Sequence, residues 1–77
     1  MRFLLTRLIP ISPKNLEKKI IKLGFRPIRQ KGNHVFYKHP DGRTTSIPFH
    51  GNYEIGPVLL GKILRDIKIS REEFNQL

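Results

Sequence analysis

Apolar residues recur at helical spacing near the start of the chain. Leu16, Ile20 and Leu23 are separated by four and three positions, which places them on one face of a helix. The Ser-Pro pair at residues 12–13 supplies a capping hydroxyl followed by a proline suited to the first helical position. Gly24 is suited to the C′ position, where a helix ends. The pattern therefore predicts a first helix between the Ser-Pro pair and this glycine.

A second helical pattern occupies the C-terminal third of the chain and begins at Pro57. Its apolar stripe consists of Leu60, Ile63, Leu64 and Ile67. Ser70 and Glu73 then have the spacing of a capping box, which predicts a short last helix. Ile69 and Phe74 flank this box at the two positions of a hydrophobic staple.

Between the helices, three short segments are rich in β-forming residues and are separated by turns. Strands are predicted at residues 25–30, 34–38 and 43–49. A Lys-Gly-Asn turn at 31–33 joins the first two strands, and a Pro-Asp-Gly turn joins the last two. Because proline cannot donate a hydrogen bond to a ladder, the strand is expected to lie with the backbone nitrogen of Pro27 facing outward from the ladder.

The Pro-Asp-Gly turn allows two pairings of the last two strands. A two-residue Asp41-Gly42 loop would pair Pro40 with Arg43. A type I turn followed by a left-handed Gly42 would instead pair His39 with Arg43. We favour the second pairing, because it keeps Pro40 out of the ladder.

This pairing divides the strand side chains between two faces. The face expected to meet the helices holds Val35, Tyr37, Thr45, Ile47 and Phe49. The other face holds His34, Phe36, Lys38, Thr44 and Ser46. A slip of one residue would exchange the two sets. The sequence thus predicts an α+β fold of the order α-β-β-β-α, followed by a short helix. Helices would cover one face of a three-stranded antiparallel sheet.

The charge of the chain indicates what kind of partner it binds. Fifteen Lys and Arg residues against six Asp and Glu give a net charge of +9. Such an excess attracts polyanions, so nucleic acid is the first candidate partner and an anionic membrane surface the second. Lys18 and Lys22 of the first helix are expected to contact phosphate. The whole chain, residues 1–77, is expected to form one domain, with its chemistry on the binding surface itself.

The residue types that are missing exclude several kinds of site. The chain has no cysteine, which excludes disulfides, thiolate zinc sites and cysteine nucleophiles. No two of its three histidines have the i, i+4 spacing of a zinc helix, so neither a metal nor a cofactor is expected. The apolar stretch at residues 1–11 is short and is interrupted by Arg7 and Pro10. We therefore expect a cytoplasmic protein with no membrane partner.

A basic hairpin with the sequence Arg-Gln-Lys-Gly-Asn at residues 29–33 leads directly into His34. RNA carries its own nucleophile, the ribose 2′-hydroxyl, so its cleavage requires a base, an acid and cations near the phosphate. Histidine titrates near neutral pH and suits either proton-transfer role, which we predict for His34. Gly32 would let the backbone approach a phosphate closely. The predicted cations are Arg29, Lys31 and Lys38.

Three further side chains lie near this hairpin in the predicted fold. Phe36 is on the open face, where its ring can stack on a base. His50 follows the last strand closely enough to assist His34. His39 precedes Pro40 and is interpreted as a turn residue.

The order and spacing of several runs resemble the HicA (YcfA-like) family of toxins, from about Leu8 to the C-terminus. The runs are Gly24-Phe25, Arg29-Gln30-Lys31-Gly32-Asn33-His34, His39-Pro40-Asp41-Gly42-Arg43, Ile47-Pro48-Phe49-His50-Gly51, Pro57 with Leu60 and Ile63-Leu64, and Ile69-Ser70-Arg71-Glu72-Glu73-Phe74. The resemblance implies a double-stranded-RNA-binding-like fold and an endoribonuclease that cleaves mRNA. It also implies a HicB-type antitoxin that neutralises the enzyme.

The resemblance also assigns roles to residues of the hairpin. The catalytic histidine of the family, in its Gly-Ser-His motif, falls on His34. The serine of that motif is Asn33 here, so a role that needs its hydroxyl is lost, while Asn33 remains a candidate RNA contact. The histidine that often follows is Val35, which argues against two catalytic histidines in adjacent positions. Residues 1–7 look like an extension of the usual start.

Two functions of different classes follow from these observations. The first is a metal-independent endoribonuclease with His34 as general acid or base. The second is a non-catalytic module that reads double-stranded RNA by its shape. New RNA ends after incubation would separate the two. An acidic antitoxin is expected to cover the basic face and bury His34.

Overall fold

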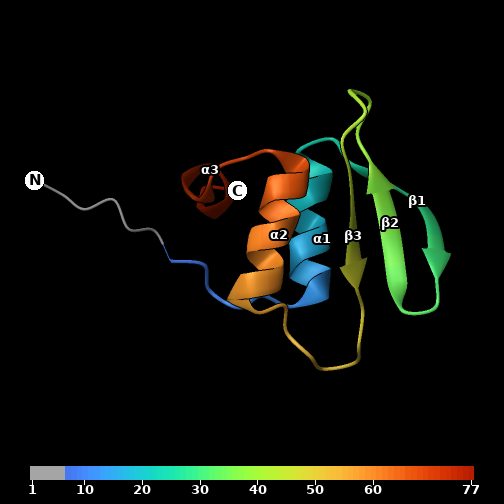
Figure 1. Cartoon of the computed structure of the whole chain (residues 1–77), viewed down its shortest axis with the longest axis horizontal. Helices are drawn as coiled ribbons and strands as arrows, with labels where there is room; N and C mark the ends of the chain where they lie inside the picture. The colour runs from blue at the N-terminus through green and yellow to red at the C-terminus, as the bar shows by residue number, and fades with distance from the viewer. Residues whose placement is uncertain (1–6) are drawn as a thin grey trace, which may run out of the picture.

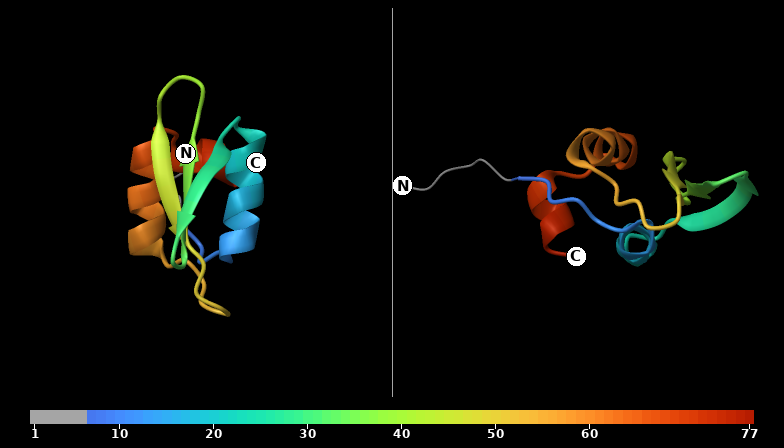
Figure 2. Two further views of the ribbon diagram at one scale, coloured as in Figure 1. Left: turned by 90° about the vertical axis from the view of Figure 1, so that its right-hand side faces the viewer. Right: turned by 90° about the horizontal axis from the view of Figure 1, so that it is seen from below.

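The computed structural model describes residues 7–77, so the expected N-terminal extension lies outside the described residues except for Arg7. The elements are α1 Pro13–Lys22, β1 Arg26–Lys31, β2 His34–Lys38, β3 Thr44–Pro48, α2 Pro57–Ile67 and α3 Arg71–Asn75. The strands form one antiparallel sheet in the order β1-β2-β3. α1 and α2 lie side by side against one face, and no described element covers the other (Figure 1, Figure 2). The predicted α+β fold is confirmed.

Local signals set both ends of α1. Ser12 caps the first turn with its hydroxyl, as the Ser-Pro pair predicts. At the other end Gly24 has a φ of +105°, and the backbone N–H of Phe25 donates to the Ile20 carbonyl at 3.1 Å. This is the Schellman arrangement. Because Phe25 completes the helix end, β1 begins at Arg26, one residue later than predicted.

The β2–β3 hairpin has the favoured pairing. The backbone N–H of His39 donates to the Arg43 carbonyl at 2.9 Å, and Gly42 is left-handed with a φ of +101°. Pro40 therefore stays outside the ladder. β3 is one residue shorter at each end than predicted. The expected face assignment is confirmed by the pairs Val35 with Ile47 and Tyr37 with Thr45, of which Tyr37, Thr45 and Ile47 are buried.

β1 is an edge strand, which is where a strand proline such as Pro27 is tolerated. Its pairing with β2 slips between Pro27 and Arg29, which leaves Ile28 as an extra, bulged residue. The strand continues to Lys31, which the sequence had assigned to the turn. The turn itself is reduced to the two residues 32–33.

The core lies between the sheet and the two long helices. Its members that are fully buried include Leu16, Ile20, Phe25, Tyr37, Ile47, Leu60, Ile63 and Ile67. The hydroxyl of Tyr37 donates to Glu17 Oε2 at 2.5 Å. Burial, together with this carboxylate, raises the pKa of Tyr37 well above its ordinary value.

α3 packs on the side of α1 and α2 that faces away from the sheet (Figure 1). The predicted capping box is present: Ser70 N donates to Glu73 Oε1 at 2.8 Å, and Glu73 N donates to Ser70 Oγ at 3.0 Å. Phe74 is buried, and Lys19 Nζ donates to its carbonyl at 3.2 Å while lying 4.6 Å above its ring. One lysine of α1 is therefore used to hold α3.

A short β-bridge joins the segment before α1 to the loop after β3. Ile11 N donates to Ile55 O at 3.1 Å, and Ile55 N donates to Ile11 O at 2.7 Å. The loop between β3 and α2 is thereby fixed at its C-terminal end.

Candidate functional site

The candidate site begins at the tight turn between β1 and β2. Lys31 and His34 form the last pair of this hairpin, so two residues close the turn. Of these two, Gly32 has a positive φ of +58° and Asn33 does not, which is the pattern of a type II′ turn. A side chain at Gly32 would meet no atom within 4 Å. The backbone conformation is therefore what requires glycine here.

His34 opens β2 on the uncovered face of the sheet, as predicted, and its side chain is exposed. Within residues 7–77, no hydrogen bond holds its ring. Its nearest aromatic neighbour is His50, whose ring centroid lies 5.9 Å away at an interplanar angle of 78°. The two histidines come from different segments of the chain and meet at one end of the sheet.

Asn33 connects the turn to the loop that carries His50. Its carbonyl accepts a hydrogen bond of 2.7 Å from Phe49 N. Its side-chain amide nitrogen lies 3.2 Å from Nδ1 of His50. When the amide nitrogen donates to Nδ1, the proton of a neutral His50 ring is on Nε2. Asn33 was expected to contact RNA; the contact that the fold gives it is to His50.

A groove of about 500 Å³ opens beside the two histidines. Its polar and aromatic lining includes His34, His50, Tyr53, Glu54 and Lys62. Ile55 and Leu59 supply apolar surface. Pockets of this size are typical of sites for small organic groups. We call this hollow the His34–His50 groove.

Tyr53 and Lys62 line this groove, although neither was predicted as a site residue. Tyr53 is 72% exposed and its ring centroid lies 6.4 Å from that of His50. Lys62 belongs to the polar side of α2, and it also pairs with Asp66 at 3.4 Å. Only the close approach of α2 to β3 brings Lys62 to the groove.

The predicted cations do not all gather at His34. Lys31 is directly opposite His34 in the hairpin. Arg29 lies two pairs further along the hairpin, with its guanidinium 4.5 Å above the ring of Phe36. A base that stacks here would meet the guanidinium of Arg29, which is itself a stacking surface. Lys38 is at the far end of β2, about 13 Å from His34 at the usual rise per residue.

The lysines of α1 are also remote from the turn. α1 ends with Lys22, and Figure 1 shows this end of the helix at the opposite end of the domain from the β1–β2 hairpin. Lys18 lies one turn earlier on the exposed surface. Any phosphate that these two lysines bind is therefore several nucleotides from one held at His34.

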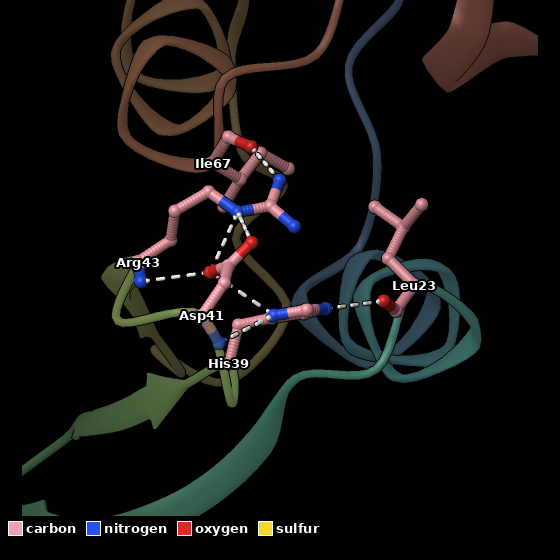
Figure 3. Close-up of polar contacts among 5 residues, drawn as sticks. All are labelled: Leu23, His39, Asp41, Arg43 and Ile67. Carbon is pink, nitrogen blue, oxygen red and sulfur yellow. Dashed lines mark hydrogen bonds and ion pairs between the residues drawn. The ribbon is translucent and has the colours of Figure 1, made fainter.

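The third histidine has a structural role, in agreement with its interpretation as a turn residue (Figure 3). His39 Nε2 is 3.0 Å from Leu23 O, and its Nδ1 is 3.1 Å from Asp41 N. Arg43 Nε donates to Asp41 Oδ2 at 2.9 Å, and Arg43 Nη1 donates to the carbonyl of Ile67 at the end of α2. This network joins the β2–β3 turn to the C-terminal ends of both long helices.

The network also explains why residue 24 is a glycine and why the pKa of Asp41 is lowered. A Cβ at Gly24 would lie 2.9 Å from Nε2 of His39, so the close approach of this ring requires glycine as much as the positive φ does. Hydrogen bonds from Arg43 lower the pKa of Asp41 from 3.8 to about 2.

Within the described part of the chain, no group of three or more metal-binding side chains comes together. The same residues include no helix that is both long and apolar enough to span a bilayer.

Comparison with curated proteins gives no match. A family model described as the HicA toxin of bacterial toxin–antitoxin matches residues 13–69, from the start of α1 to the residue before the Ser70 cap. This span includes the hairpin, both histidines of the groove and the His39 network, so the chain belongs to the HicA toxin family.

Proposed function

We propose that this toxin is a metal-independent endoribonuclease that cleaves mRNA and is neutralised by a HicB-type antitoxin. The observation that carries the proposal is the state of His34. This ring is exposed beside a groove, and among residues 7–77 no hydrogen bond engages its nitrogens. A histidine in this state is free to exchange a proton with a bound substrate.

The reaction uses the nucleophile that RNA supplies. His34 removes or relays the proton as the 2′-oxygen attacks the adjacent phosphorus and the bond from phosphorus to the 5′-oxygen breaks. The products are a 2′,3′-cyclic phosphate and a free 5′-hydroxyl. Lys31, across the hairpin from His34, offsets the negative charge that grows on the phosphate. The net charge of +9 draws RNA to the protein.

A cleavage assay tests this function. Wild type, His34→Ala and Thr44→Ala are incubated in EDTA with a labelled, mostly single-stranded RNA. Thr44 is an exposed residue at the far end of the sheet, so Thr44→Ala controls for surface substitution. We expect cleavage by wild type and the control but not by His34→Ala. Equal cleavage by His34→Ala would remove the assignment.

The same assay addresses the alternative function. Binding that weakens steeply with salt while the RNA stays whole would favour a non-catalytic double-stranded-RNA-binding module. The assay is repeated in a translating extract, where mRNA is presented on ribosomes. RNA left whole in both settings would overturn the ribonuclease proposal.

The antitoxin is proposed to act by covering the groove. An acidic partner would associate rapidly with this basic protein and exclude RNA. The reactivity of His34 with diethyl pyrocarbonate measures its access, with wild-type toxin compared alone and in the co-purified complex. Protection of His34 is expected, and undiminished reactivity would exclude direct occlusion.

A further inference from the structure

His34 and His50 are neighbours in the lining of the groove, and only His34 has a role in the reaction proposed above. We propose that His50 is the second catalytic residue, which gives a proton to the leaving 5′-oxygen. We further propose that the groove beside it holds the nucleoside on the 3′ side of the cleaved bond. The inference rests on the proposed ribonuclease function and assigns the two halves of its proton transfer.

The separation of the rings suits one phosphate. The ring centroids of His34 and His50 are 5.9 Å apart, and the rings are nearly perpendicular at 78°. At this separation both rings can reach oxygens of a single phosphate by hydrogen bonds of ordinary length. The attacking and leaving oxygens lie on opposite sides of the phosphorus in an in-line displacement. A base on one side and an acid on the other meet that requirement.

The contact with Asn33 supports the role of His50 as the acid. The amide nitrogen of Asn33 is 3.2 Å from Nδ1 of His50, and when it donates to Nδ1 the neutral ring carries its proton on Nε2. When the ring gains a second proton, a half-turn of the same amide presents its oxygen to Nδ1–H. In the doubly protonated ring, Nε2 therefore carries the proton that His50 can give away. Within residues 7–77 no such contact fixes a proton on His34, so His34 takes the role of base.

The proton balance then closes without another reactant. Neutral His34 takes the proton of the 2′-hydroxyl as the new oxygen–phosphorus bond forms. The bond from phosphorus to the 5′-oxygen breaks, and the imidazolium of His50 gives its Nε2 proton to that oxygen. His50 is left neutral with its remaining proton on Nδ1, held by the Asn33 amide oxygen, and proton exchange with water returns both rings to their starting states. The titratable and charged groups that share the groove with His50 are His34 from β2, Tyr53 and Glu54 from its own loop and Lys62 from α2.

The leaving oxygen belongs to the nucleoside on the 3′ side, so this nucleoside lies on the His50 side of the phosphate. There the groove of about 500 Å³ has an exposed aromatic wall, Tyr53, at 6.4 Å from the His50 ring. Stacking on an exposed ring binds any base without sequence preference. Lys62 on the α2 side is placed to bind the next phosphate.

A change of leaving group tests the role of His50. Two RNAs are compared that differ only at the cleaved bond, one with the normal 5′-oxygen and one with sulfur in its place. A thiolate leaves without being protonated. We expect His50→Ala to slow cleavage of the normal RNA by about 100- to 10,000-fold, the range of general acid catalysis, and to slow the sulfur RNA by less than about tenfold. His34→Ala should slow both RNAs, because both need the base.

The outcomes separate the inference from the function on which it rests. If His34→Ala cleaves both RNAs at the wild-type rate, the ribonuclease assignment fails. If His34→Ala is slow while His50→Ala matches wild type on the normal RNA, only the role of His50 fails. Equal slowing of both RNAs by His50→Ala also overturns the role as acid. His50→Gln repeats the comparison with a side chain of similar size, and melting curves of each variant exclude loss of folding.

A substrate that lacks one base tests the subsite. Tyr53→Ala and Tyr53→Phe are assayed with RNA that carries a base or an abasic residue on the 3′ side of the cleaved bond. Tyr53→Ala should raise KM for the complete RNA by about 10- to 100-fold, as expected for loss of one stacked base. Tyr53→Phe should keep the wild-type KM, and the abasic RNA should not distinguish the three proteins. An equal effect of Tyr53→Ala on both RNAs would place the 3′ nucleoside elsewhere.

Discussion

The two ends of the sheet each place a histidine beside a tight turn with a left-handed glycine, yet their environments differ. At the β2–β3 end, both ring nitrogens of His39 have partners, at 3.0 Å and 3.1 Å, and its side chain is 19% exposed. At the β1–β2 end, His34 is exposed, and among residues 7–77 its ring has an aromatic neighbour but no hydrogen bond. We call these the His39 end and the His34 end.

The difference separates two uses of the same side chain. A ring whose nitrogens are both satisfied within the fold contributes to stability and is unavailable to a ligand. A ring with free nitrogens beside a groove contributes little to stability and is available for chemistry. Substitution at the His34 end should therefore change activity, and substitution at the His39 end should change stability.

The largest expected effect is at the His34 end. His34→Ala should lower kcat/KM by about 100- to 10,000-fold, because one proton-transfer group is lost. Its melting temperature should stay close to that of wild type, since substitutions at exposed positions usually change stability by less than about 0.5 kcal/mol. Cleavage rates and calorimetry on the same preparations measure both. A large fall in melting temperature would place His34 in the same class as His39.

The next effect is expected at the His39 end. His39→Ala removes the contacts to Leu23 O and Asp41 N and the packing of the ring against Phe25, 5.1 Å between centroids. We expect a loss of about 2 kcal/mol in the free energy of unfolding, from one or two hydrogen bonds and lost packing. In a domain of this size, that lowers the melting temperature by about 10 °C. His50→Ala is the matched control, an exposed histidine whose loss should leave the melting temperature unchanged.

The activity of His39→Ala completes the comparison of the two ends of the sheet. Below its melting temperature, His39→Ala should cleave RNA at the wild-type rate per folded molecule. A large loss of activity in the folded variant would show that the two ends are coupled.

A smaller effect concerns acid stability at the His39 end. The pKa of Asp41 is lowered from 3.8 to about 2 by its hydrogen bonds from Arg43. Because the folded value lies below the unfolded value, this carboxylate stabilises the protein above about pH 4, and its contribution disappears as the pH falls toward 2. Asp41→Asn should flatten the dependence of melting temperature on pH in this window. Parallel pH curves for the variant and wild type would contradict the assignment.

The smallest expected effect is a gain in stability. Lys68 ends α2 with a φ of +57°, a conformation that favours glycine. Lys68→Gly should stabilise the domain by about 1 kcal/mol or less, because a side chain in this conformation costs about that much. Chemical denaturation measures the gain, with Lys62→Gly in the middle of α2 as the opposite control. Destabilisation by Lys68→Gly would mean that its side chain makes contacts worth more than the strain.

The fold was predictable because its signals are local. The cap at Ser12, the glycine at residue 24 and the capping box at Ser70 each act within a few residues. The pairing of β2 with β3 followed from keeping Pro40 out of the ladder, and the face of every residue on these two strands followed from that pairing. The errors were confined to single residues at strand ends, where Phe25 completes α1 and Lys31 extends β1.

The site was only partly predictable, because contacts between distant segments complete it. The position of His34 on the open face followed from the strand period, but the path of the loop that carries His50 did not. That path depends on the bonds from Phe49 N to Asn33 O and between Ile11 and Ile55. Tyr53 and Lys62 were missed for the same reason. The distance of Lys38 from His34, by contrast, follows from the rise of a strand alone.

The bridge between Ile11 and Ile55 bears on how this protein is prepared for experiment. The family match begins at residue 13, so a gene trimmed to that boundary would omit Ile11. The protein would lose the Ser12 cap of α1, and the loop with His50 and Tyr53 would lose its two backbone bonds to the N-terminal segment. Under the proposed ribonuclease function, we expect such a trimmed protein to cleave RNA more slowly than the full chain, because the loop that carries His50 and Tyr53 is no longer fixed.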